Sequence, residues 1–326
     1  MNRWGFCIVF LLVLVTCCSY ASRVIETENE IKFIKLKFLS QEEARELLGS
    51  EDRYINQLTK FDMSALCGDV YSSKENVRDK IKANALEWTE DEKRRWNEVA
   101  DSLNSIILRN GYLLKLPENI RLVKSTLEEC GGAGGYTRED YIVLGETSNF
   151  TSKYMMMELL IHELFHVISR NTPDFREKMY GVVGFTVLPD EIVIPEKLRD
   201  RMITNPDVNK YDCWADFMIE GKRTKCTMIL FAREEYAGGS FLYYVNIGLL
   251  QLDDNYAPVC DENGDVILYH VEQATDFFHK VGDNTNYILH PEEIMATNFT
   301  YLLTETWHEL PSQHIIMKIK EILLHK

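Results

Sequence analysis

Residues 153–170, with the sequence KYMMMELLIHELFHVISR, decide the fold, because they predict a long helix that is apolar on almost every side. Pro173 follows shortly afterwards and ends the helical pattern. An amphipathic surface helix would show a broad polar face, whereas this segment is apolar almost all round. We therefore expect the helix to lie at the centre of the molecule.

Two histidines in this helix, His162 and His166, are four residues apart. This spacing places both imidazoles on one face, one turn apart, which is about the separation that two ligands of one Zn²⁺ require. Glu163 lies beside them and can reach a water at the metal, where a general base is needed. Without a metal, burial of these groups among leucine, phenylalanine and valine would be costly. The motif therefore predicts a zinc site with Glu163 as the catalytic base; histidines paired with other polar groups in the core are the alternative.

A catalytic zinc ion needs three protein ligands and one open position. After His166, the chain has Ser169 and Thr172 where a metzincin has a glycine and a third histidine, so that branch is excluded. The remaining common solution is a carboxylate from a second helix. Asp190 and Glu191 are weaker candidates, because prolines flank them in a β-prone stretch.

Residues 290–299, HPEEIMATNF, contain a better candidate. Pro291 suits the first turn of a helix. The face that begins with Glu293 continues with small side chains, namely Ala296, Thr297 and Thr300. Small side chains allow this helix to approach the central one closely enough for a carboxylate to reach the metal. We therefore predict Glu293 as the third ligand, with Glu292 as its local rival; both also suit the positive end of a helix.

The HELFH motif combined with a glutamate on a later helix resembles the gluzincin branch of the zincin metallopeptidases. The segment Glu293-x-x-Ala296-Thr297-Asn298 is similar to the helical signature E-x-x-A-[DN] of that branch. The chain departs from thermolysin-like members in the longer separation between His166 and Glu293. It also has Thr297 where an acidic residue usually supports the metal ligands.

The resemblance implies an α+β, zincin-like fold with a central HExxH helix, a mostly antiparallel small sheet, a helical N-terminal region and C-terminal helices. It also implies hydrolysis of a peptide or protein substrate, in which one Zn²⁺ per chain acidifies a water and polarises the scissile carbonyl. Glu163 would transfer the proton to the leaving amine. The candidates for stabilising the oxyanion are Tyr243, Tyr244, His270, Tyr287 and His290. The alternatives are a catalytically silent zincin-fold secreted binding protein and a structural protein with an accidental motif.

The remaining segments give a coarse outline of three regions: a signal peptide at 1–21, a helical N-terminal region at 22–116 and a zincin-like domain at 117–326. Capping signals at Ser40 and Thr89 predict helices that end at Gly49 and near Gly111. The apolar stripe of the second helix is expected to pack in the core. The other predicted elements are an antiparallel hairpin of 120–127 with 141–144 around a glycine-rich turn at 131–135, strands at 226–232, 241–250 and 266–270, and helices from Pro291 and at about 311–325.

The composition is that of a folded globular protein, with 45% hydrophobic and 27% charged residues among 326. The 51 acidic residues exceed the 36 basic ones, and the net charge of -15 argues against nucleic acid or an anionic membrane as a partner. Residues 1–21 combine Arg3, an apolar run of about a dozen residues and small residues before a cleavage point. This run is shorter than the ~20 residues that span a membrane, so we expect a secreted, extracellular protein without a membrane anchor.

In a secreted protein, cysteines can form disulfides and Asn-x-Ser/Thr sequons can carry N-glycans. Five cysteines remain after the leader, and Cys213 with Cys226 is a reasonable local disulfide, although the sequence does not settle the pairing. A more speculative role for Cys67 is zinc ligation in a latent precursor. Asn149 is a plausible site for an N-glycan. Asn298 is expected to be unmodified, because a glycan there would push the proposed ligand helix off its neighbour.

Overall fold

The computed structural model describes residues 32–130 and 134–324. The predicted signal peptide and residues 131–133 of the predicted glycine-rich turn lie outside the described residues. The helices are α2 (Gln41–Leu48), α3 (Arg53–Gln57), α4 (Lys60–Cys67), α5 (Lys74–Ala83), α6 (Glu90–Asn110), α7 (Lys153–Asn171), α8 (Pro173–Val182), α9 (Glu196–Arg199), α10 (Phe277–Val281), α11 (Pro291–Leu303) and α12 (Gln313–Leu324). The strands are β1 (Leu36–Phe38), β2 (Ala85–Leu86), β3 (Ile120–Ser125), β4 (Gly135–Arg138), β5 (Tyr141–Leu144), β6 (Thr186–Val187), β7 (Cys213–Ile219), β8 (Lys222–Ala232), β9 (Val245–Gln251) and β10 (Leu268–His270).

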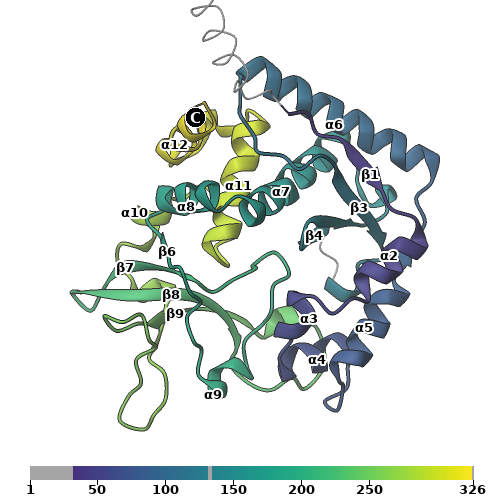
Figure 1. The fold of residues 1–326 in the computed structure, drawn as a ribbon. Helices are drawn as coiled ribbons and strands as arrows, with labels where there is room; N and C mark the ends of the chain where they lie inside the picture. Colours follow the sequence, from purple (N-terminus) through teal and green to yellow (C-terminus); the bar gives the residue numbers. More distant parts are fainter. Residues whose placement is uncertain (1–31, 131–133, 325–326) are drawn as a thin grey trace, which may run out of the picture.

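Helix α7 occupies the centre of the molecule, as its apolar sequence predicts. It packs against α6, α8 and α11 and against strands β4 and β5 (Figure 1). Most of its side chains after Leu160 are buried, and they join the largest hydrophobic cluster of the protein. The prediction of an α+β protein with a central helix over residues 153–170 is confirmed.

The first sheet is mixed and has the order β1-β3-β5-β4, with β2 paired to β3. The pairs β1–β3 and β3–β5 are parallel, whereas β4–β5 and β2–β3 are antiparallel. The expectation of an antiparallel hairpin between residues 120–127 and 141–144 is therefore wrong. The hairpin partner of β5 is β4, which begins at Gly135 inside the predicted glycine-rich turn. Gly135 suits this place because a Cβ there would approach the carbonyl oxygen of Val143 to 2.8 Å.

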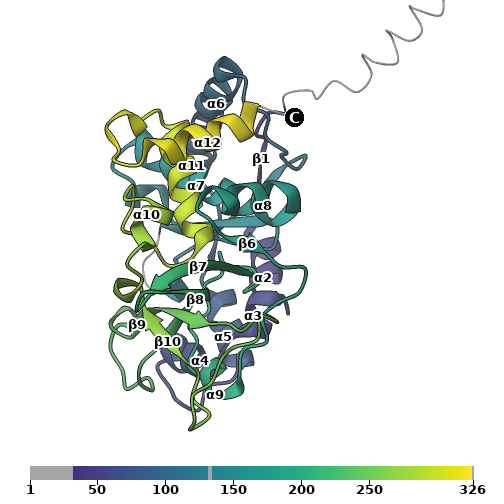
Figure 2. The ribbon, with the colours of Figure 1, turned by 90° about the vertical axis from the view of Figure 1, so that its left-hand side faces the viewer.

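The second sheet is antiparallel, with the order β10-β9-β8-β7-β6. Figure 2 shows it below helices α7, α8, α11 and α12. The predicted strands at 226–232, 241–250 and 266–270 correspond to β8, β9 and β10, although residues Phe241–Tyr243 form a 3₁₀ turn before β9 begins. A mostly antiparallel arrangement is thus correct for this sheet and incorrect for the first.

The N-terminal region of residues 22–116 contributes strands β1 and β2 to the first sheet, where both pair with β3. Helix α6 begins at a capping box on Thr89 and ends at Gly111, whose φ of 70° is the left-handed conformation that favours glycine. Its apolar stripe contributes Trp96, Val99 and Leu103 to the main core. The N-terminal region and the segment from residue 117 onward therefore share a sheet and a hydrophobic core.

The cysteines and the two sequons lie in contrasting environments. Cys213 and Cys226 are buried free thiols on β7 and β8, so the predicted disulfide is absent. Cys226 is paired with Ala215, and Cys213 comes two residues before Ala215, at the start of β7. Asn298 is fully buried, and its Oδ1 accepts a hydrogen bond from Asn284, whereas Asn149 is exposed.

In residues 32–130 and 134–324, no helix has the length and apolarity that crossing a bilayer requires.

Candidate metal centre

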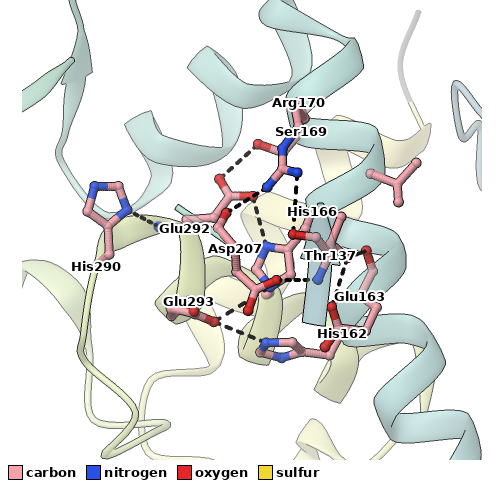
Figure 3. Close-up of polar contacts among 12 residues, drawn as sticks. Thr137, His162, Glu163, His166, Ser169, Arg170, Asp207, His290, Glu292 and Glu293 are labelled. Atoms are coloured by element: carbon pink, nitrogen blue, oxygen red, sulfur yellow. Dashed lines mark hydrogen bonds and ion pairs between the residues drawn. The ribbon is translucent and has the colours of Figure 1, made fainter. Parts of the chain in front are cut away.

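The two histidines of the HELFH motif project from α7 toward α11, which crosses it (Figure 3). Ser152 is the N-cap of α7, and its hydroxyl accepts a hydrogen bond from the amide of Met155. His166 is fully buried, and the His162 side chain is 20% exposed. His162 is therefore the histidine on the solvent side of the pair, and His166 is the one in the core.

Glu293 completes the cluster from the first turn of α11, where His290 is the N-cap and Pro291 occupies the first turn. Its Oε2 atom lies 3.1 Å from Nε2 of His162 and 3.6 Å from Nε2 of His166. Tetrahedral zinc with bonds of about 2.1 Å places its ligand atoms about 3.3–3.5 Å apart. Both distances from Glu293 Oε2 are close to this spacing, and the three residues offer ligand atoms that all lie within 4.8 Å of one another.

His166 gives an independent test of whether these residues fit a metal. Its Nε2 atom is buried and has no hydrogen-bond partner within the described chain. The ring's other nitrogen, Nδ1, lies 3.0 Å from Oε1 of Glu292. Because an ionised carboxylate only accepts hydrogen bonds, a proton is assigned to Nδ1, and in the neutral ring the lone pair of Nε2 would face His162 and Glu293. An unsatisfied lone pair in this position suits a cation.

Glu292 contacts the other nitrogen of His166 and lies outside the group formed by His162, His166 and Glu293. In addition to His166, its carboxylate accepts hydrogen bonds from Ser169 at 2.8 Å and from Tyr180 at 2.6 Å. Burial raises the pKa of this carboxyl, but hydrogen bonding from His166 and Tyr180 outweighs burial and holds the pKa below its usual value. Glu292 is therefore a buried, ionised partner of His166, as commonly found behind metal-binding histidines.

The segment between α9 and β7 adds two residues that the sequence analysis did not single out. Asn205 donates a hydrogen bond to Oε1 of Glu293 at 2.5 Å, which leaves Oε2 directed at the histidines. Asp207 accepts a hydrogen bond from the amide of Thr137 at 2.6 Å and lies close to Glu163 and His166. In the sequence, Asn205-Pro206-Asp207 is an ordinary turn signal, and nothing in it indicates a position beside the site.

Glu163 lies on the side of the site formed by β4. Its Oε2 accepts a hydrogen bond from the hydroxyl of Thr137 at 2.8 Å. Burial, reinforced by the nearby carboxylate of Asp207, raises the pKa of Glu163 well above its ordinary value. A carboxylate with a raised pKa is a stronger base once it is ionised. Glu163 and His162 both line a cavity of about 1040 Å³.

Of the residues proposed for oxyanion stabilisation, Tyr287 is the one beside the cluster. Its ring centroid lies 6.2 Å from that of His162, and it lines the same cavity. His290 is buried, accepts a hydrogen bond from the amide of Glu292 and thus serves as a helix cap. Tyr243 is almost fully exposed, and His270 caps the 3₁₀ turn after β10. The hydroxyl of Tyr244 donates to the carbonyl of Gly238.

The other sequence candidates lie away from the centre. Glu191 is exposed and forms an ion pair with Arg53, and Asp190 is also exposed. Cys67 ends α4 and packs against a separate hydrophobic cluster. Thr297 donates its hydroxyl to the carbonyl of Glu293. The acidic side chain that contacts His166 is Glu292, and not a residue at position 297.

A comparison of the whole chain with protein-family models, with curated proteins and with solved structures found no match. The function is therefore argued from the site itself.

Proposed function

We propose that this protein is a secreted, gluzincin-type zinc metallopeptidase that hydrolyses peptide bonds, with His162, His166 and Glu293 as ligands and Glu163 as the general base. The observation that carries the proposal is the convergence of the two histidine Nε2 atoms on Glu293 Oε2, at 3.1 and 3.6 Å, with Nε2 of His166 buried and lacking a hydrogen-bond partner within the described residues. Three neutral or anionic ligands with one open position are typical of catalytic zinc sites.

The chain's own groups suit the chemistry of peptide hydrolysis. A zinc ion at this site supplies Lewis acidity toward a carbonyl oxygen and toward water. Glu163 takes the proton of the attacking water and gives it to the leaving amine, and Thr137 holds the carboxylate in place for both transfers. Tyr287 lies on the cavity side of His162, where a phenol can donate to the developing oxyanion.

The decisive experiment is metal analysis of the purified mature protein and of Glu163→Gln, with both assayed against a mixed peptide library. We expect one zinc per chain in both proteins and chelator-sensitive cleavage by wild type alone. The Gln side chain keeps the volume of Glu163 and removes its basicity, which is expected to lower turnover by roughly 10²–10⁴-fold.

The other outcomes identify the alternatives. Zinc in both proteins with no cleavage by either would favour a zincin-fold binding protein. The absence of metal from both would overturn the proposed site. Cleavage by Glu163→Gln at the wild-type rate would remove Glu163 from its role as base.

A further inference from the structure

The cavity beside the candidate metal centre has mainly apolar walls that come from distant parts of the chain. One wall is formed by the start of α7 and the residues before it, including Phe150 and Leu159. Further apolar lining comes from α4, from β8 and from the segments before β9 and α11, and includes Phe61, Leu230, Phe241 and Leu289. Its volume of about 1040 Å³ lies at the upper end of the range for ligand sites.

Apolar side chains are also exposed to water among the lining residues. Met155, Leu242 and Tyr287 line the cavity, and they are 42%, 60% and 45% exposed. Leu242 stands in the 3₁₀ turn Phe241–Tyr243, close after Gly238 and Gly239. Leaving such side chains in water is unfavourable, and their grouping around one cavity is typical of a binding groove for apolar ligands.

The carboxylates of the cavity indicate the charge of the ligand. Asp62 and Glu129 are saturated by hydrogen bonds from neighbouring side chains or amides. Glu128 and Glu158, in contrast, have no ion-pair or hydrogen-bond partner for their carboxylates within residues 32–130 and 134–324. Glu158 precedes His162 by one turn of α7 and so lies on the same face. The single lysine among the lining residues, Lys80, is directed at the carbonyl of Leu66 at 2.6 Å.

We propose that this cavity binds an extended, cationic peptide with bulky apolar side chains, and that such peptides are the substrates of the site. This inference rests on the proposed function. Apolar side chains would pack between the walls described above, and lysine or arginine side chains would face Glu128 and Glu158. The overall charge of -15 would further attract a cationic chain. Anionic lipids and nucleic acids, which are also large and partly apolar, are disfavoured by the same carboxylates.

The test uses the full mature chain of Glu163→Gln, loaded with zinc, so that binding is measured without cleavage. Three synthetic peptides of equal length are compared by fluorescence anisotropy: a leucine- and lysine-rich parent, a version with leucine replaced by serine, and a version with lysine replaced by glutamate. We expect the parent to bind at least about tenfold more tightly than either relative. Its affinity should fall as salt is added, because surface charges are screened.

Two pairs of variants locate the binding groups. Leu242→Ser should weaken binding of the parent peptide about three- to tenfold, whereas the control Leu108→Ser, at a similarly exposed leucine on α6, should not. Glu158→Gln should weaken the parent peptide and reduce its salt dependence, whereas the control Glu46→Gln on α2 should change neither. Glu46, Leu108 and Leu242 are exposed and Glu158 is partly exposed, so we expect all four variants to fold, and circular dichroism checks this.

The outcomes separate the inference from the function on which it rests. Equal binding of the three peptides, tighter binding of the glutamate version, or no binding of the parent would overturn the inference. Library cleavage by wild type without preference for apolar, cationic segments would also overturn it and leave the proposed peptidase intact. Selective binding by Glu163→Gln combined with no cleavage by wild type would overturn the peptidase and leave the ligand class intact.

Discussion

His166 and Glu292 form a buried pair in which Nδ1 of the imidazole lies 3.0 Å from Oε1 of the carboxylate. The residue that follows Glu292 in the chain presents its own carboxylate to the opposite nitrogen of the same ring, at 3.6 Å. Two adjacent glutamates therefore contact both edges of one histidine. This arrangement orients the ring and increases its basicity as a ligand.

Glu292→Ala is expected to weaken zinc binding about 10–100-fold, because His166 would lose the group that fixes its tautomer and orientation. Competition with a coloured chelator measures this affinity. Tyr180→Phe is the matched control, since it removes only one hydrogen bond to Glu292 and keeps the bond to His166. A zinc affinity that is unchanged in Glu292→Ala would contradict the supporting role of this residue.

Thr137→Val is expected to shift the acidic limb of the pH profile of kcat/KM to higher pH. The hydrogen bond from Thr137 stabilises the ionised form of Glu163 and so lowers its pKa against the larger effect of burial. Its loss raises that pKa further, so a larger fraction of the base is protonated at a given acidic pH. Thr137→Ser keeps the hydroxyl and should retain the wild-type profile. Superimposable profiles for Thr137→Val and wild type would exclude this contribution.

Tyr287→Phe is expected to lower kcat by about 10²-fold with a small change in KM and no loss of zinc, because the phenol would act on the transition state. The hydroxyl of Tyr287 has no hydrogen-bond partner in the described part of the chain, and its side chain is 45% exposed, so folding should be unaffected. Tyr243→Phe, which alters a tyrosine that is almost fully exposed, is the control. A kcat of Tyr287→Phe equal to that of wild type would contradict the role of Tyr287 as the oxyanion donor.

The stability of the apoprotein should fall as the pH decreases from about 6.5 toward 4. Burial, with help from the nearby charge of Arg176, lowers the pKa of His290 to about 4, while Glu292 and Asp212 act in the opposite direction. The unfolded chain binds this proton near pH 6.5, so acid favours unfolding until the folded state also takes it up. The full effect is on the order of 3 kcal/mol.

His290→Asn tests this expectation, because asparagine can still cap α11 and does not titrate. Urea unfolding at several pH values should give a shallower loss of stability in the variant than in wild type. The other titrating groups are common to both proteins and cancel in the difference. Parallel curves for the two proteins would show that His290 does not contribute.

Local patterns predicted helices α2, α6, α7, α11 and α12 and the shared face of His162 and His166. The capping boxes at Ser40 and Thr89 and the apolar run of α7 act over a few residues, so the chain itself contains the relevant information. Strand pairing was harder to predict. The segments β3 and β5 have the composition of strands, but their parallel pairing depends on β4 filling the outer position in the sheet, and no local pattern encodes that choice.

The sequence alone determined that His162 and His166 share a face and that Glu163 adjoins them, because helix geometry relates residues four positions apart. Only the tertiary structure shows which of the two glutamates, Glu292 or Glu293, faces the Nε2 atoms of both histidines. Consecutive residues on a helix point in directions about 100° apart, so the packing of α11 on α7 directs one carboxylate to Nδ1 and the other to Nε2. The positions of Thr137, Asn205 and Asp207 likewise depend on contacts between distant segments, which follow from the packing of the whole core.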